Sequence, residues 1–284
     1  MRSERVTVGD LGLHVVRWEG GGRPFVLVHG LASNAHLWDG VGEHLAAAGH
    51  PVVAVDQRGH GRSDKPDHGY DTATVVGDLL GLVVALGLDR PVLAGQSWGA
   101  NVVLETAATA PERIAAVALV DGGWIHLADA FPTWESCKAA LAPPVLEGMP
   151  AARLEAAIRS AHPSWPEAGI RGTMANFEVR ADGTIRPWLS HDRHLSILRS
   201  LYEHQPRDRY EAVRAPVLLA PAGGPDDPPR RGWDQTEAVT EAEAALADAR
   251  VRWFPGADHD LHAQHPAELA EALLALAADA EGHR

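Results

Sequence analysis

The feature that most constrains the fold of this chain is a serine between glycines, at the junction of a predicted strand and a predicted helix. Residues 95–99, Gly-Gln-Ser-Trp-Gly, follow the apolar run 90–94 and precede the helix-compatible run 100–107. A side chain at either glycine would collide with the neighbouring strand or helix, and so tight a turn needs the conformational freedom of glycine. The turn lifts the Ser97 hydroxyl above the sheet edge, and the Trp98 amide opens the helix. We interpret the segment as a nucleophile elbow.

A serine hydroxyl is a weak nucleophile at neutral pH and needs a base within hydrogen-bond reach. His259 follows the predicted strand 251–254 and comes after the serine in the chain. This places it at the carboxyl edge of the sheet, where open α/β folds carry their sites. His262 is the competing imidazole, three residues further on. We therefore predict that His259 is the base, with His262 as the alternative.

Composition and charge exclude several classes of protein. The 284 residues are 45% hydrophobic, which suffices for one large α/β domain with an insertion. The formal charge of −13 comes without a basic stripe, so nucleic acid and anionic membranes are poor partners. The spacing of the histidines and the lone cysteine predicts no metal site.

The expected environment is a reducing one. The single cysteine, Cys137, excludes an internal disulfide framework. The N-terminal residues lack the apolar core of a signal peptide, and the most apolar stretch, 79–88, is too short to span a bilayer. We expect a cytoplasmic monomer or homodimer that acts on a small molecule, without a cofactor.

Strands and helices alternate along most of the chain. The pattern predicts a hairpin near the N-terminus, then strands at 25–29, 52–56, 90–94, 114–121, 215–220 and 251–254, and helices at 37–48, 71–86, 100–107 and 266–278. Such alternation predicts a mostly parallel sheet with helices on both faces.

The alternation stops between residues 122 and 213. We predict that this segment is an inserted helical cap, and that residues 1–121 and 214–284 form the core. The cap is rich in aromatic residues, which suit an apolar ligand. We predict that Trp38 and Trp124 contact the substrate.

Four segments give the chain a resemblance to the α/β-hydrolase superfamily, from about residue 15 to the C-terminus. They are His29-Gly30-Leu31, residues 56–63 (Asp-Gln-Arg-Gly-His-Gly-Arg-Ser), the elbow at 95–99, and residues 256–259 (Gly-Ala-Asp-His). The resemblance implies that Ser97 is the nucleophile and His259 the general base. It also implies that the amides of Leu31 and Trp98 form the oxyanion hole, and that His29 and residues 56–63 are structural.

The acid that orients His259 has two candidate positions. Members of this superfamily usually carry it shortly after the penultimate strand, where Asp226 and Asp227 stand one residue out of step with the usual spacing. A minority place it directly after the strand that follows the nucleophile helix, and Asp121 occupies that place. Either geometry delivers a carboxylate to the imidazole. We keep Asp121 and Asp226 as alternatives, with Asp227 behind them.

These residues predict a serine hydrolase that cleaves a small, largely apolar carboxylic ester or lactone through an acyl-enzyme. The same residues would also serve a carbon–carbon bond hydrolase or a proline iminopeptidase. A peptidase of that kind should hold a free amine with acidic cap residues. A non-catalytic ligand-binding receptor of the same fold is the alternative from another class.

Overall fold

One large sheet organises the protein. The structure, a computed structural model, describes residues 1–227 and 235–282. The strand order is β1-β2-β4-β3-β5-β6-β9-β10. The strands are β1 (Arg2–Val8), β2 (Leu11–Trp18), β3 (Phe25–Val28), β4 (Val52–Val55), β5 (Val92–Gln96), β6 (Ala116–Val120), β9 (Val217–Ala220) and β10 (Ala249–Val251). Strands β1 and β2 pair with antiparallel neighbours, and every pairing from β4 to β10 is parallel, which confirms the predicted fold class.

Two apolar layers cover the sheet because successive strand residues point to opposite faces. In β3, Val26 and Val28 pack into one layer, and Phe25 and Leu27 pack into the other. The first layer is completed by α2 (Thr72–Ala85), α3 (Trp98–Thr109) and α9 (Gln235–Ala245). The second is completed by α1 (Asp39–Ala47) and α11 (Pro266–Gly282).

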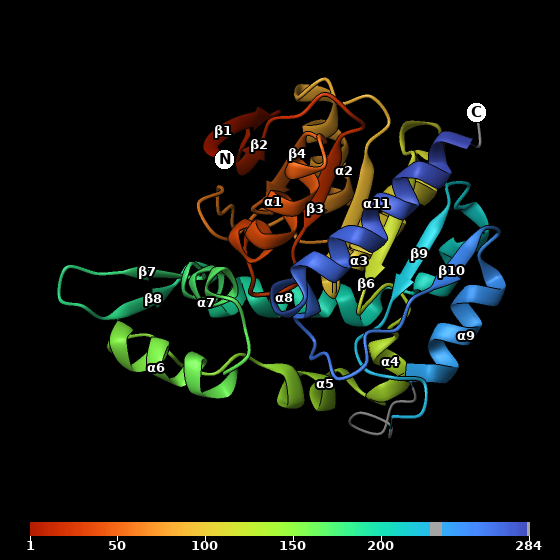
Figure 1. The fold of residues 1–284 in the computed structure, drawn as a ribbon. Coiled ribbons are helices and arrows are strands. Elements are labelled where there is room, and N and C mark those ends of the chain that lie inside the picture. Colours follow the sequence, from red (N-terminus) through yellow and green to blue (C-terminus); the bar gives the residue numbers. More distant parts are fainter. Residues whose placement is uncertain (228–234, 283–284) are drawn as a thin grey trace.

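The segment between β6 and β9 adds no strand to this sheet. It holds α4 (Leu127–Ala130), α5 (Trp134–Leu141), α6 (Ala151–Ala161), α7 (Glu167–Met174), β7 (Phe177–Val179), β8 (Ile185–Pro187), α8 (His191–Glu203) and the 3₁₀ helix η3 (Pro206–Ala212). In Figure 1, its green and teal elements lie along the lower side of the core, away from both termini. The boundaries at 122 and 213 stay a prediction, and we call residues 122–213 the insertion.

Several predicted elements differ in their bounds from those observed, among them one helix and one strand. The predicted helix 37–48 begins instead as a 3₁₀ turn, η1 (Ala35–Trp38), before α1. Asn34 caps this turn by accepting from the His36 amide. The predicted strand 251–254 lies earlier in the chain, because β10 pairs with β9 from Ala249 to Val251. Short pieces complete the chain: η2 (Pro111–Arg113) and α10 (Leu261–Gln264).

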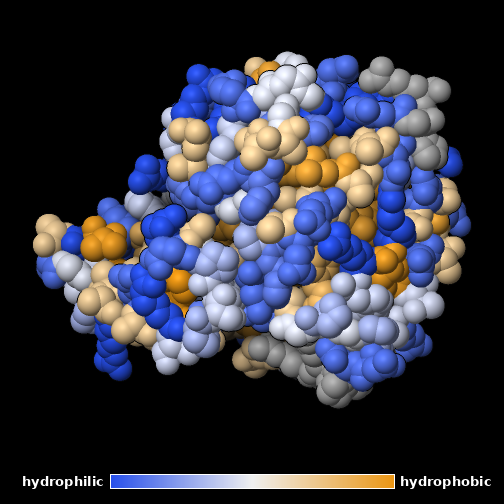
Figure 2. Space-filling view, in the orientation of Figure 1, coloured by the Kyte–Doolittle hydropathy of each residue, from blue (hydrophilic) through white to orange (hydrophobic). Residues whose placement is uncertain are grey.

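Polar and apolar side chains are mixed on the face of the molecule that Figure 2 shows. Within residues 1–227 and 235–282, no helix is long and apolar enough to cross a membrane.

Candidate active site

Ser97 stands in a strained turn between β5 and α3. Its backbone lies at φ 54° and ψ −120°, in a region that residues with a side chain rarely adopt. Such a conformation costs on the order of 1–3 kcal/mol and persists only where the surroundings enforce it. Here the Ser97 amide donates to the Val120 carbonyl of β6 at 2.9 Å, and the Ser97 carbonyl accepts from the Ala100 amide at 2.9 Å.

Close backbone packing explains the glycines at the elbow. A Cβ on Gly95 would lie 2.1 Å from the carbonyl oxygen of Gly99. A Cβ on Gly99 would lie 2.4 Å from the Val28 oxygen, and one on Gly122 would lie 2.5 Å from the Ser97 oxygen. These contacts are with backbone atoms, which cannot rotate away. The elbow therefore packs closely against β3 on one side and against the turn after β6 on the other.

Asp121 is hydrogen-bonded to His259. The His259 Nδ1–H donates to Asp121 Oδ2 at 2.7 Å. The carboxylate is only 5% exposed, and its other oxygen accepts from the Ala222 amide at 3.0 Å and the Gln235 side-chain amide at 2.7 Å. In turn, the His259 carbonyl accepts from Gln96, the residue before the nucleophile candidate, at 2.9 Å.

Asp226 takes no part in this arrangement. It is exposed in the loop after β9, and no hydrogen bond joins it to His259 within the described part of the chain. Asp227 accepts instead from the Gly224 amide at 2.8 Å. Of the two candidate carboxylates, the structure places Asp121, which follows β6, beside the His259 imidazole.

The loop after β3 lies against the elbow. A Cβ on Gly30 would lie 3.0 Å from the Ser97 Cβ, so Leu31, the next residue in the chain, lies close to Ser97. Trp98 is the first residue of α3, and the first amides of a helix have no partner within it. The oxyanion hole formed by the Leu31 and Trp98 amides stays a prediction that this arrangement favours.

His29 fixes the same loop from inside. Its Nδ1–H donates to the Gly30 carbonyl at 2.7 Å, and its Nε2 accepts from the Gln57 amide at 3.0 Å. Burial lowers the pKa of His29, so the ring stays neutral and both bonds are kept. This is the structural role that the resemblance implies.

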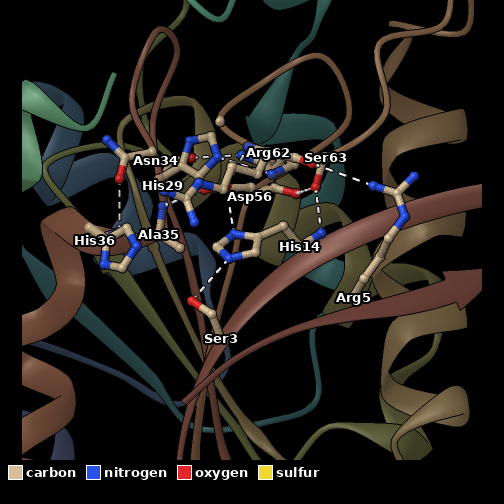
Figure 3. Close-up of polar contacts among 12 residues, drawn as sticks. Ser3, Arg5, His14, His29, Asn34, Ala35, His36, Asp56, Arg62 and Ser63 are labelled. Carbon is tan, nitrogen blue, oxygen red and sulfur yellow. Dashed lines mark hydrogen bonds and ion pairs between the residues drawn. The ribbon is translucent and has the colours of Figure 1, made fainter. Parts of the chain in front are cut away.

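Asp56 joins the loops after β3 and β4 (Figure 3). The carboxylate accepts from the His14 Nδ1–H, the Ala35 amide and the Arg62 amide, each at 2.8 Å, while His14 Nε2 faces Ser3 Oγ at 3.1 Å. Burial opposes the charge, but the His14 hydrogen bond and the nearby imidazoles hold the pKa of Asp56 below its ordinary value. The buried carboxylate therefore stays charged and holds both loops.

The sequence analysis did not single out His60, because it assigned residues 56–63 only a structural role. Its Nδ1–H donates to the Arg58 carbonyl at 3.0 Å, and its Nε2 accepts from the Ala32 amide at 3.3 Å. The ring stacks on Trp98, with centroids 5.5 Å apart. Burial lowers the pKa of His60 well below its usual range. The one signal in the sequence is a histidine between two glycines.

The fold and these contacts can be compared with known proteins. The sequence model of the alpha/beta hydrolase fold family matches residues 23–266. The chain belongs to this family. It is therefore an enzyme of the hydrolase class built on this fold.

Relatives align over most of this hydrolase. It is 28% identical over 270 residues to 2-(acetamidomethylene)succinate hydrolase of Mesorhizobium japonicum, which covers 93% of this chain and 91% of the relative. It is 29% identical over 276 residues to a non-heme chloroperoxidase of Streptomyces lividans, covering 90% and 91%. A crystal structure of E-2-(acetamidomethylene)succinate hydrolase superposes with a TM-score of 0.82 at 25% identity, covering 97% and 98%.

His262, the competing base, is buried in the core of the hydrolase. Its ring lies tilted against the Trp38 ring, with centroids 4.5 Å apart and an angle of 47° between the ring planes. Within the described residues, neither ring nitrogen has a hydrogen-bond partner. Burial lowers the pKa of His262 to about 3, so it stays uncharged at neutral pH. The residue is fully buried.

The two tryptophans predicted to contact the substrate are core residues. Trp38 packs with α1 and α11, and Trp124 packs in the layer of α2 and α3. Both are almost fully buried. Neither lines the large cavity described next, so their predicted contact with substrate gains no support from the structure.

A cavity of about 410 Å³ lies between the loops of the core and the insertion. The core contributes Ala32, Ser33, His60 and Gly61. The insertion contributes residues from three stretches, 143–147, 176–177 and 186–194. Because Ala32 and His60 contact each other beside Trp98, the cavity adjoins the predicted oxyanion loop.

Asp258 connects the insertion to the loop of His259. Its carboxylate accepts from the Trp165 indole N–H at 3.1 Å and lies 3.3 Å from His162 Nδ1. Its amide donates to Gln264 at 2.8 Å. Two residues of the insertion thus fix the position next to the base candidate.

Across the described ranges, no three histidine, cysteine, aspartate or glutamate side chains are grouped so that they could hold a metal ion.

Proposed function

We propose that this hydrolase cleaves a carboxylic ester or lactone through an acyl-enzyme formed on Ser97. The observation that carries the proposal is the 2.7 Å hydrogen bond from His259 to the buried carboxylate of Asp121, which directly follows β6, the strand beside β5. A carboxylate at Nδ1 fixes the imidazole in the tautomer whose Nε2 can accept a proton. Ser97, His259 and Asp121 supply the three roles that serine hydrolysis needs.

The reaction follows from these roles. The Ser97 oxygen attacks the carbonyl carbon while His259 accepts its proton. The Leu31 and Trp98 amides donate hydrogen bonds to the oxyanion, each contributing about 3 kcal/mol to transition-state stabilisation. His259 then passes the proton to the departing alcohol, which leaves an ester on Ser97. Water repeats the attack and releases the acid and the free serine.

The carboxylates of the insertion do not favour a proline iminopeptidase. Four of its glutamates are paired with guanidinium groups: Glu155 and Glu167 with Arg159, Glu147 with Arg180, and Glu178 with Arg186. A carboxylate already paired with arginine attracts an amine weakly. A carbon–carbon bond hydrolase would use the same serine and histidine, so substrate comparison has to separate it from an esterase.

Covalent labelling tests the proposal. A fluorophosphonate should label the native protein and the control Ser196→Ala, an exposed serine on α8, but not Ser97→Ala. Hydrolysis of p-nitrophenyl acetate should fall by on the order of a thousandfold or more in Ser97→Ala. Labelling that persists in Ser97→Ala would contradict the assignment. Ligand binding without labelling or turnover would indicate a receptor.

A further inference from the structure

The cavity has an apolar body with a few polar side chains. Its apolar wall includes Leu146, Phe177, Trp188 and Leu189 from the insertion. Small-molecule sites commonly combine such a wall with a few polar groups that fix the ligand's orientation. The polar groups of this wall therefore indicate which ligand it accepts.

Two of these polar groups each have a buried atom without a hydrogen-bond partner within the described residues. The Ser33 hydroxyl and the His194 Nε2 are buried, and neither has a hydrogen-bond partner within the described residues. Ser33 is 8% exposed and His194 is 7% exposed, and both line the cavity. Buried polar atoms are almost always hydrogen-bonded, because an unpaired one is destabilising. A ligand in the cavity would supply the missing partner to both.

Hydrogen-bond donors, rather than net charge, suit the cavity to an anionic ligand group. The ionisable residues that line it are one guanidinium, three imidazoles and one carboxylate: Arg186, His60, His191, His194 and Glu147. The carboxylate, Glu147, is paired with Arg180 outside the wall. Arg186 is itself paired with Glu178. The Ser33 hydroxyl and the His194 imidazole each keep one atom unpartnered by the described residues, and hydroxyl and imidazole groups can donate to a carboxylate.

We propose that the cavity binds the acyl part of an ester whose far end is a carboxylate, held by the Ser33 hydroxyl and the His194 imidazole. The inference rests on the proposed function, since it places the acyl carbonyl at the elbow. Ser33 follows Leu31 by two residues, a separation of at most about 7 Å along the chain. The distance suits the half-ester of a short dicarboxylic acid, with its methylene groups against the apolar wall.

Two esters of equal acyl length test the proposal: p-nitrophenyl hydrogen glutarate and p-nitrophenyl valerate. The native enzyme should prefer the glutarate by about tenfold or more in kcat/KM, the effect of charge-assisted hydrogen bonds. Ser33→Ala and His194→Leu should each reduce this preference by about tenfold, mainly through KM for the glutarate.

Matched variants separate hydrogen bonding from packing. Ser33→Thr and His194→Gln keep a donor and should retain most of the preference. Ser196→Ala and His68→Leu change exposed residues and should keep all of it. Loss of the preference in the donor-retaining variants as well as in Ser33→Ala and His194→Leu would overturn the proposal.

The two proposals fail in different ways. Equal kcat/KM for both esters in the native enzyme would overturn the carboxylate subsite, while the labelling of Ser97 would stand. If neither ester is cleaved and Ser97 is not labelled, the hydrolytic function fails. Calorimetry with glutarate then decides on the subsite: binding that His194→Leu weakens supports it, and no binding overturns it.

Discussion

Buried imidazoles make individual histidines sensitive to acid. Burial lowers the pKa of His29, His60, His194 and His262 below the ordinary value of 6.5. Each is favoured as a neutral ring in the folded protein and takes up a proton more readily once unfolded. The contribution of each ring to stability is complete above pH 6.5 and is lost as the pH falls toward the folded-state pKa.

His262 gives the sharpest prediction, because its folded pKa is about 3. Between pH 6.5 and about 3, the unfolded chain binds one proton at this residue that the folded protein does not. In His262→Phe, the free energy of unfolding should therefore depend less on pH, by about 1.4 kcal/mol per pH unit. Urea titrations across this range measure it. Parallel pH profiles for the native protein and His262→Phe would contradict the prediction, and exposed His68→Phe serves as control.

Single residues also show what local pattern can predict. The sequence placed a serine, a histidine and two candidate carboxylates at strand ends. Whether Asp121 or Asp226 meets His259 depends on how the chain turns after β9, and neighbouring residues do not encode that path. The same limit applies to Ser33 and His194, which lie far apart in the chain and meet only at the cavity. Trp38 and Trp124 were predicted to contact substrate from their aromatic character, which suits a core equally well.

At the scale of elements, the elbow depends on how closely α3 approaches β3. In Gly99→Ala, the new methyl group would lie 2.4 Å from the Val28 carbonyl oxygen and 2.6 Å from that of His29. The backbone would have to move, so the change should destabilise the protein by about 1–3 kcal/mol or more and reduce turnover.

Gly77→Ala is the matched change. Gly77 is exposed within α2, and a Cβ there would meet no atom within 4 Å. Since alanine favours a helix over glycine, this variant should gain about 0.5–1 kcal/mol. Urea unfolding measures both variants. If the free energy of unfolding changed in the same direction in both variants, the close packing of Gly99 would not determine the effect of Gly99→Ala.

Two helix starts differ in how well the sequence predicted them. Asp71 was expected to cap the helix that follows it, and its side chain accepts from the Thr74 amide at 2.9 Å. The start of η1 has the local cap Asn34, and in addition the Ala35 amide donates to the buried carboxylate of Asp56, which follows β4. A hydrogen bond to a residue distant in the chain leaves no trace in helical periodicity, and the predicted helix 37–48 missed the turn that begins at Ala35.

At the scale of the whole molecule, parallel strand order assembles the candidate site. Ser97 follows β5, Asp121 follows β6, and His259 comes after β10, so all three reach the same sheet edge although the chain separates them widely. The alternation of strands and helices predicted this edge. It could not predict the cavity, whose walls come from the insertion as well as from the core.

The kcat for p-nitrophenyl acetate in Asp121→Asn and Asp226→Asn tests the central claim most directly, with folding of both variants checked by thermal unfolding. If Asp121 holds His259 in the catalytic tautomer, Asp121→Asn should lower kcat by about ten-thousand-fold, as expected for loss of an orienting aspartate. Asp226→Asn, in the exposed loop, should leave kcat unchanged. Equal losses in the two variants, or a larger loss in Asp226→Asn, would contradict the account.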